Sequence, residues 1–144
     1  MDTQRVDLLV FLPAVFVFVF VGILFLVAYN RKGSVATVQM SKRRLVVQSP
    51  APPQVVYGWL VQHCPGGYAV EDHDPSRGIV LLSSRPSAFT WGFFYPAVVS
   101  ADGAGTRVDL GIKSKAFQYG PLVTRAHRKL AGALAGLVQG RVAE

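Results

Sequence analysis

The sequence has no charged residue between Leu8 and Tyr29, a stretch of 22 residues. Almost all of it is Val, Leu, Ile, Phe or Ala. A helix of about 20 apolar residues is long enough to cross a bilayer core of about 30 Å. The stretch also lacks His and Cys, so it offers no side-chain ligand for a haem or chlorophyll metal and no proton relay. We therefore predict a helix that anchors or packs and does not conduct or ligate.

Cysteine is nearly absent, since Cys64 is the single one. An intramolecular disulfide is therefore excluded, and no oxidising compartment is required. The sequence has no nucleophile elbow, no Walker loop and no dinucleotide fingerprint. The sequence has only two clusters of possible metal ligands, which are His63 with Cys64 and the run Glu71–Asp74. Neighbours in sequence point in different directions, so we expect no enzyme, no catalytic residue, no metal and no cofactor.

Acidic residues are scarce, with 8 Asp and Glu against 15 Lys and Arg and a net charge of +7. The tail Met1–Asp7 carries −1, so the chain after the apolar stretch carries +8. Such a charge beside a membrane most simply faces anionic lipid headgroups. Nucleic acid is the other usual partner of basic domains, but no helix-turn-helix, RNP or zinc-finger pattern is present. We therefore predict no nucleic-acid partner.

The apolar stretch does not have the pattern of a cleaved signal peptide. The tail before it is acidic, the stretch is too long, and YNRKG follows without a small-residue cleavage pattern. Arg5 is the one basic residue before the stretch, and five basic residues follow within about 15 positions. These five are Arg31, Lys32, Lys42, Arg43 and Arg44. The positive-inside rule predicts a single-pass protein with its N-terminus outside (periplasmic) and its C-terminal domain in the cytoplasm.

Hydrophobic periodicity after residue 30 predicts one small domain of the α+β class. We divide the chain into a tail (1–7), a transmembrane helix (8–29), a linker (30–37) and a basic domain (38–144). The predicted order is strand, helix, several antiparallel strands and a long C-terminal helix. The ranges are one or two strands in Val35–Ser49, a helix in Pro53–His63, strands in Tyr68–Glu71, Ile79–Ser84, Phe89–Ser100 and Thr106–Lys113, and a helix in Pro121–Val142.

The segment RLVVQSPAPPQVVYGWL is a strand that leads into a Pro-rich helix start, and a long terminal helix begins at Pro121. In this order the domain resembles the helix-grip (START-like) superfamily, in which a curved antiparallel sheet wraps a long C-terminal helix. The resemblance is topological and covers about Val38–Glu144. A deep ligand cavity is common in that superfamily, and a ligand-binding domain of this type would have an internal cavity lined by Trp59, Trp91 and Phe93.

Two groups of residues are candidate partner contacts. Phenylalanines on more than one side of the apolar helix are suited either to lipid or to partner helices and the pigments or lipids that partners hold. On the last helix, glycines at a spacing of four share a face with basic residues, and such glycines allow another backbone to approach closely. The candidates are Phe16, Phe18, Phe20, Phe25, Arg125, Arg128, Lys129, Gly132, Gly136 and Gly140.

A third candidate contact is the aromatic run Phe89–Pro96. Phe94 falls on the opposite face from Phe93 and Tyr95, in a patch with Phe117 or Tyr119. Exposed aromatic patches mark an interface or a membrane contact more often than a catalytic site.

These features predict a non-catalytic accessory subunit that stabilises a larger integral membrane complex, and the phenylalanines suit a bioenergetic assembly, photosynthetic or respiratory. The alternative is a membrane-anchored lipid or apolar-ligand-binding domain of helix-grip type. A catalytic domain that uses His63, Cys64 or His73 is the third hypothesis.

Overall fold

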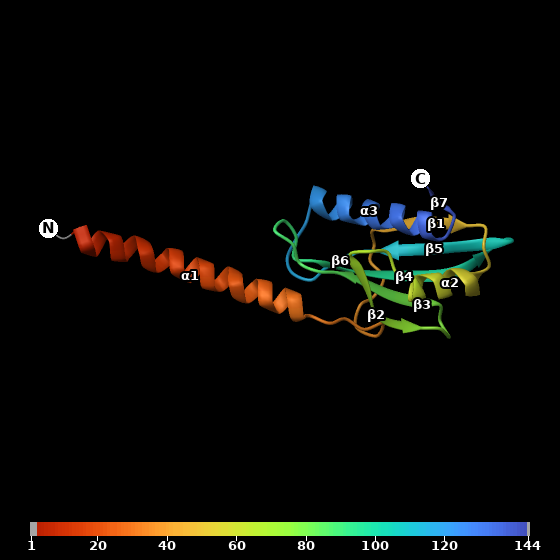
Figure 1. The fold of residues 1–144 in the computed structure, drawn as a ribbon, viewed down its shortest axis with the longest axis horizontal. Helices are drawn as coiled ribbons and strands as arrows, with labels where there is room; N and C mark the ends of the chain where they lie inside the picture. Colours follow the sequence, from red (N-terminus) through yellow and green to blue (C-terminus); the bar gives the residue numbers. More distant parts are fainter. Residues whose placement is uncertain (1–2, 144) are drawn as a thin grey trace.

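The computed structural model describes the backbone of residues 3–143 and the side chains of residues 9–143. Figure 1 shows a long N-terminal helix that extends away from a layered domain. The elements are α1 (Thr3–Asn30), β1 (Arg44–Ser49), α2 (Pro53–Gln62), β2 (Tyr68–Asp74), β3 (Ile79–Ser84), β4 (Phe93–Asp102), β5 (Gly105–Gly111), β6 (Lys113–Ser114), α3 (Pro121–Leu137) and β7 (Arg141–Ala143). This order confirms the predicted α+β class, and it is the order that the helix-grip resemblance implies.

The seven strands form one antiparallel sheet in the order β2-β3-β4-β5-β1-β7, and the short β6 pairs with β4. Tight turns connect β2 to β3 and β4 to β5, whereas α2 connects β1 to β2. β1, the first strand, therefore lies between β5 and β7 near one edge of the sheet. Val47 in β1 pairs with Val108 in β5, and both side chains are buried.

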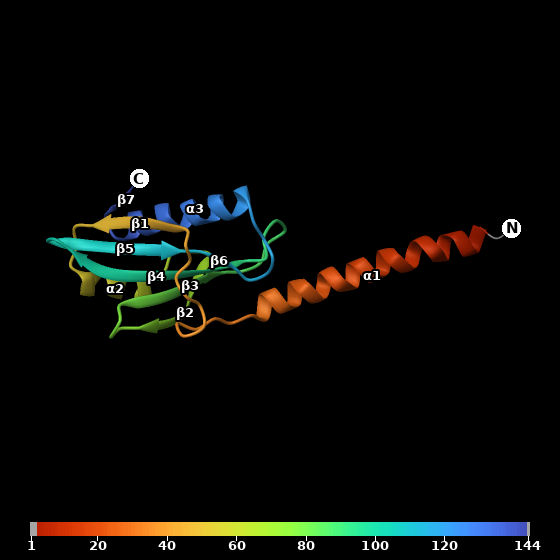
Figure 2. The ribbon, with the colours of Figure 1, turned by 180° about the vertical axis from the view of Figure 1, so that it is seen from behind.

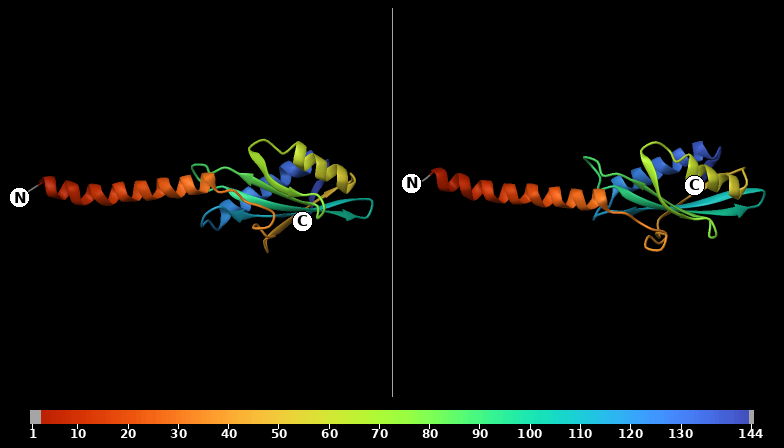
Figure 3. Two further views of the ribbon diagram at one scale, coloured as in Figure 1. Left: turned by 90° about the horizontal axis from the view of Figure 1, so that it is seen from below. Right: turned by 60° about the horizontal axis from the view of Figure 1, so that its bottom comes forward.

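Both domain helices cover the same face of the sheet, as Figure 3 shows. α2 begins at Pro53. Proline is tolerated there because N–H groups in the first turn of a helix have no acceptor within the helix, so the missing N–H of proline removes no hydrogen bond. The predicted stripe of α2 buries Val56 and Leu60, although Val55 stays 41% exposed. The stripe of α3 buries Leu130 and Leu134. Burial of such side chains between helices and sheet is the main favourable contribution to folding.

The segment between α1 and β1 lies on the opposite face of the sheet, where Figure 2 shows it crossing in front of the strands. Val38 is buried there against Leu81 and Phe94. The backbone N–H of Val35 donates to Asp72 Oδ2 at 2.8 Å. The prediction of a strand from residue 35 is therefore wrong before Arg44, because Ser34–Val38 forms a hydrogen-bonded turn that caps the sheet.

The last helix is shorter than predicted and ends at Leu137 instead of Val142. Gln139 has a φ of 55°, and the N–H of Gly140 donates to the Ala135 carbonyl at 2.8 Å, which closes the helix. The chain then pairs along β1 as β7. The pairing satisfies backbone N–H and C=O groups on the outer side of β1, and this favours the strand over five more residues of helix.

Candidate functional site

The end of the domain from which α1 leaves carries three exposed aromatic side chains. Phe89 lies in the β3–β4 loop, and Phe117 and Tyr119 lie in the loop before α3. They are 80%, 92% and 84% exposed, respectively. Figures 1 and 3 show both loops beside the last turns of α1. Phe89 was expected in a strand, but that strand begins only at Phe93.

Hydrogen bonds within and between the two loops hold this surface together. The N–H of Ser87 donates to the Thr90 carbonyl at 2.7 Å, and the N–H of Thr90 donates back to Ser87 Oγ at 3.2 Å. Gln118 contacts the backbone of Phe89 and Trp91 from the other loop. The aromatic side chains are thus exposed although their backbones are fixed, which is costly in water and typical of a contact surface. We name Phe89, Phe117 and Tyr119 the aromatic end.

A pocket of about 540 Å³ lies beside the aromatic end. Ile112, Val123, Phe117 and Tyr119 form its apolar part, and Arg31, Arg43 and Lys113 contribute positive charge. Arg43 Nη1 donates to Thr124 Oγ1 at 3.0 Å, so this arginine is held against α3. We name this the loop pocket. It combines an apolar wall with cations, which matches an amphiphile with an anionic head.

A second pocket, of about 570 Å³, lies where α1 meets the domain. We name it the junction pocket. Tyr29 and Asn30 from the end of α1 line it, together with Arg31 and with Arg85 and Lys115 from the domain. Arg31 Nη1 donates to the Lys115 carbonyl at 2.5 Å, and the guanidinium of Arg85 lies 5.9 Å from the centre of the Tyr29 ring. These contacts connect α1 directly to the domain.

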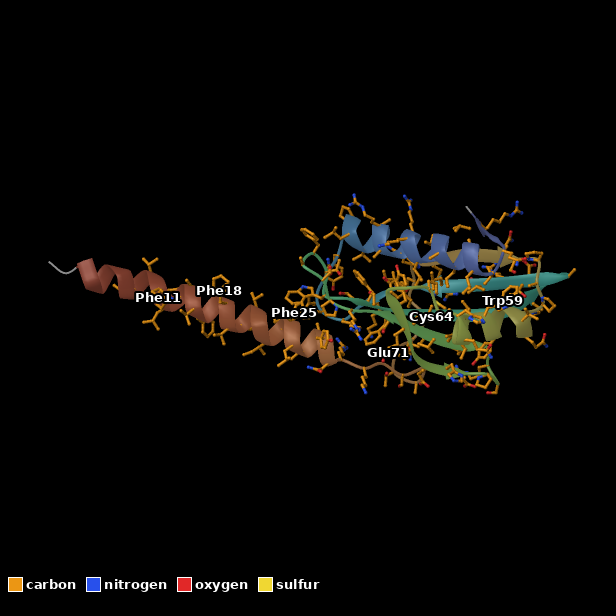
Figure 4. All side chains as sticks on the ribbon, viewed as in Figure 1. Phe11, Phe18, Phe25, Trp59, Cys64 and Glu71 are labelled. Atoms are coloured by element: carbon orange, nitrogen blue, oxygen red, sulfur yellow. The ribbon has the colours of Figure 1, made fainter. Side chains whose placement is uncertain are left out.

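The phenylalanines of α1 are exposed along its length, and Figure 4 shows Phe11, Phe18 and Phe25 projecting from the helix. The candidates Phe16, Phe18, Phe20 and Phe25 are 71%, 80%, 53% and 42% exposed. The most apolar 18-residue window within Leu9–Asn30 is not buried by the rest of the chain, and Ala28, near the end of α1, is 1% exposed. By length and composition this helix can cross a membrane.

The outer face of α3 carries most of the other predicted contacts. Arg125, Arg128 and Lys129 are exposed, as are Gly132 and Gly136. A Cβ atom added at either glycine would meet nothing within 4 Å, so another backbone has room to approach there. The spacing of these residues on one face is therefore as predicted, and whether a partner binds them stays a prediction.

Two predicted contacts do not agree with the structure. Phe94 is only 2% exposed, because the segment before β1 and the Lys115 side chain cover it, so it is unavailable to a partner. Gly140 lies outside α3 and away from the other glycines. A Cβ atom there would overlap the backbone carbonyl of Gln48, so this glycine serves the pairing of β7 with β1.

The titratable residues of the domain include Cys64 and His73 of the catalytic hypothesis, and burial or hydrogen bonding determines the environment of each one described below. Burial raises the pKa of the half-buried Cys64 thiol, which disfavours the thiolate. His127 is buried, and its Nε2 contacts the Leu110 carbonyl at 2.7 Å. Asp109 pairs with Arg107 at 3.0 Å. His73 Nδ1 contacts the Tyr57 hydroxyl at 2.9 Å. No three of the His, Cys, Asp and Glu side chains in residues 9–143 form a metal-binding group.

The cavity expected at Trp59, Trp91 and Phe93 does not coincide with the loop pocket or the junction pocket. Phe93 is 1% exposed and packs within the core beside Tyr95. Trp59 packs against the same core from α2. The loop and junction pockets were missed from the sequence. Their signal in the sequence was two basic residues followed by two aromatic residues at every second position, Lys113, Lys115, Phe117 and Tyr119. Only the structure shows that Arg31 lines both pockets with them.

No protein-family model matches this chain, and no curated protein matches it. Among solved structures, the crystal structure of Ara h 8.0201 is similar with a TM-score of 0.49 and 11% sequence identity. The similarity covers 67% of this chain and 96% of that chain.

Proposed function

We propose that this protein is a single-span membrane protein whose domain binds membrane lipid at the end from which α1 leaves. In this proposal α1 crosses the bilayer, the N-terminus lies outside, and the domain lies in the cytoplasm and has no catalytic activity of its own. The observation that carries the proposal is the position of the aromatic end and the loop pocket beside the last turns of α1.

The chemistry of the aromatic end suits the membrane–water interface. Tyrosine is enriched at that depth because its ring is apolar and its hydroxyl remains hydrated. Phe117 and Phe89 would exchange water for acyl chains, and each fully buried phenylalanine contributes about 1.5–3 kcal/mol. Arg43 and Lys113 would face anionic headgroups, where a basic residue contributes about 1 kcal/mol. The loop pocket would then receive an acyl chain against Ile112 and Val123 and hold its head among the cations.

Tryptophan quenching by brominated lipid tests this orientation in the full chain. Trp91 lies in the β3–β4 loop, whereas Figure 4 shows Trp59 at the far end of the domain. The two matched variants Trp59→Phe and Trp91→Phe each keep a single tryptophan. In bilayers that contain brominated phosphatidylcholine, we expect quenching of Trp91 and little quenching of Trp59. Equal quenching of both, or none of Trp91, would contradict the proposal.

An accessory subunit of a membrane complex is the second candidate. Two observations favour this candidate. The basic face of α3 is exposed and has open space over Gly132 and Gly136, and the phenylalanines of α1 are exposed. Extraction in mild detergent separates the two candidates. A stoichiometric large complex supports the accessory role, and a lone chain that carries lipid supports the first proposal. The respiratory or photosynthetic nature of such a complex stays a prediction.

A further inference from the structure

The junction pocket has an excess of positive charge. Four cationic side chains line it, namely Arg31, Lys32, Arg85 and Lys115, and Glu71 is its one carboxylate. Figure 4 shows Glu71 at this side of the domain. Glu71 Oε1 already accepts a hydrogen bond from Ser83 Oγ at 2.6 Å. Among the side chains of residues 9–143 the one ion pair joins Arg107 to Asp109, so none of the four cations is paired within that range.

Lys115 is the most unusual of these residues because it is only 4% exposed. Its Nζ lies 5.0 Å from the centre of the Phe94 ring. No hydrogen bond joins this Nζ to another group in residues 9–143. Every fully buried polar side-chain atom in that range has a partner, so the Nζ of Lys115 keeps some contact with solvent. Burial lowers the pKa of Lys115, the charge of Arg85 lowers it further, and Glu71 opposes this shift. An ammonium that has lost most of its hydration and still faces an open pocket is stabilised when an anion enters that pocket.

The backbone around the pocket holds the cations in place. The N–H of Lys115 donates to the Gly92 carbonyl at 3.0 Å, and Arg31 contacts the Lys115 carbonyl. Arg85 stacks over Tyr29, one residue before the end of α1. If α1 crosses a bilayer, Tyr29 and Asn30 lie at the depth of the headgroups, and the junction pocket opens at the same depth. The phosphates of membrane lipids are the anions found there.

We propose that the junction pocket binds the phosphate of one anionic membrane lipid, with Arg85 and Lys115 as its main contacts. This inference rests on the proposed function, because α1 must bring the pocket to the bilayer surface. It differs from a diffuse attraction of the basic domain to the membrane, since it predicts one bound lipid and a dependence on particular residues. A phosphate has the acceptor oxygens that such cations require.

Lipid retention by the full chain in neutral detergent tests the proposal. The purified chain is titrated with phosphatidylglycerol, phosphatidylcholine or inorganic phosphate, and native mass spectrometry counts the bound molecules. We expect one retained phosphatidylglycerol and neither of the other two. Arg85→Gln and Lys115→Met should each weaken retention by about five- to tenfold. The matched control Arg128→Gln removes an exposed charge from α3 and should change nothing.

Three results would overturn the proposal. Equal retention of phosphatidylglycerol and phosphatidylcholine would show that the anion is not recognised. Equal weakening by Arg128→Gln and Arg85→Gln would indicate diffuse charge. Retention of inorganic phosphate as strong as that of the lipid would assign the pocket to a soluble phosphate. Because the Lys115 side chain is mostly buried, circular dichroism is used to check that Lys115→Met folds. If this variant does not fold, Arg85→Gln, at an exposed residue, provides the test. Quenching of Trp91 depends on none of these side chains, so the two proposals fail separately.

Discussion

The Gln118 side chain joins the two exposed aromatic loops, since its Nε2 donates to the Phe89 carbonyl at 3.1 Å across 29 positions of sequence. The Oε1 atom of the same carboxamide accepts the N–H of Trp91 at 3.2 Å. One side chain therefore satisfies backbone groups on both sides of Thr90. The loops that carry Phe89, Phe117 and Tyr119 are held as a single surface. If that surface binds a bilayer, as proposed, less entropy is lost on binding than for two independent loops.

Replacement of Gln118 by alanine should separate the loops while leaving the core intact. We expect a loss of about 0.5–1.5 kcal/mol in the free energy of unfolding, because two hydrogen bonds are lost at a partly exposed site. Amide hydrogen exchange at Trp91 should become faster. Gln118→Glu keeps an acceptor for the Trp91 N–H but loses the donor to Phe89, so its exchange at Trp91 should stay close to wild type. Unchanged exchange in Gln118→Ala would contradict the bridging role.

Much of the fold could be predicted from the sequence because local patterns determine it. The uncharged stretch after Leu8 predicts α1, and Pro53 and Pro121 mark the first residues of both domain helices. The alternation of Val108 and Leu110 with Arg107 and Asp109 places two side chains in the core and two outside it. In each of these cases the neighbouring residues alone indicate the structure.

The errors arose where a distant segment decides the outcome. Alternation correctly placed Phe94 opposite Tyr95, but it contains no information about Val38, which covers Phe94 from 56 positions earlier. Gly140 fits the helical spacing of Gly132 and Gly136. However, α3 ends at Leu137, before Gly140, because the residues that follow pair with β1. The junction pocket joins residues from α1, β2, β3 and the loop after β6, so no local motif could indicate it.

The two glycines near the end of the chain should respond to alanine in opposite directions. Gly140→Ala should destabilise the domain by about 1–3 kcal/mol, since the new Cβ overlaps the Gln48 carbonyl and forces β7 away from β1. Gly136→Ala should stabilise it by up to about 1 kcal/mol, because α3 gains a better helix former in open space. Thermal unfolding of the full chain in detergent measures both.

The same pair of variants bears on the accessory-subunit candidate. If a partner backbone packs over Gly136, the alanine variant should lose the partner during extraction while the chain alone becomes more stable. Retention of the partner by Gly136→Ala would show that the glycine face is not the contact. Similar stabilities of Gly140→Ala and wild type would instead contradict the position of Gly140 against β1.

Asp72 fixes the segment between α1 and β1 on the sheet, and this contact can be removed. Its Oδ2 accepts the N–H of Val35 at 2.8 Å, and its Oδ1 accepts the N–H of His73 at 2.9 Å. Asp72→Ala should cost about 1–2 kcal/mol and speed amide exchange at Val35, since charged acceptors form the stronger hydrogen bonds. Asp72→Asn retains one acceptor oxygen and should lose less. Val35 exchange that is equal in Asp72→Ala and wild type would contradict this anchoring role.

Stability should fall at acid pH because His127 is buried in its neutral form. Burial lowers the pKa of His127 below its ordinary value of 6.5, the charge of Arg43 lowers it further, and the bond to the Leu110 carbonyl opposes the shift. As the pH falls below 6.5, the unfolded chain takes up a proton at this residue before the folded chain does. The unfolded state is then favoured, so the free energy of unfolding decreases toward acid pH.

The variant His127→Gln removes that proton-binding group and can still donate to the Leu110 carbonyl. Its free energy of unfolding should therefore depend less on pH between about 7 and 5 than that of the wild type. At pH 8, where His127 is neutral in both states, the variant should differ only through packing. Thermal unfolding of both chains across this range, followed by near-ultraviolet circular dichroism, measures the difference. An identical acid loss in the variant would assign the pH dependence to other groups and leave His127 as a packing residue.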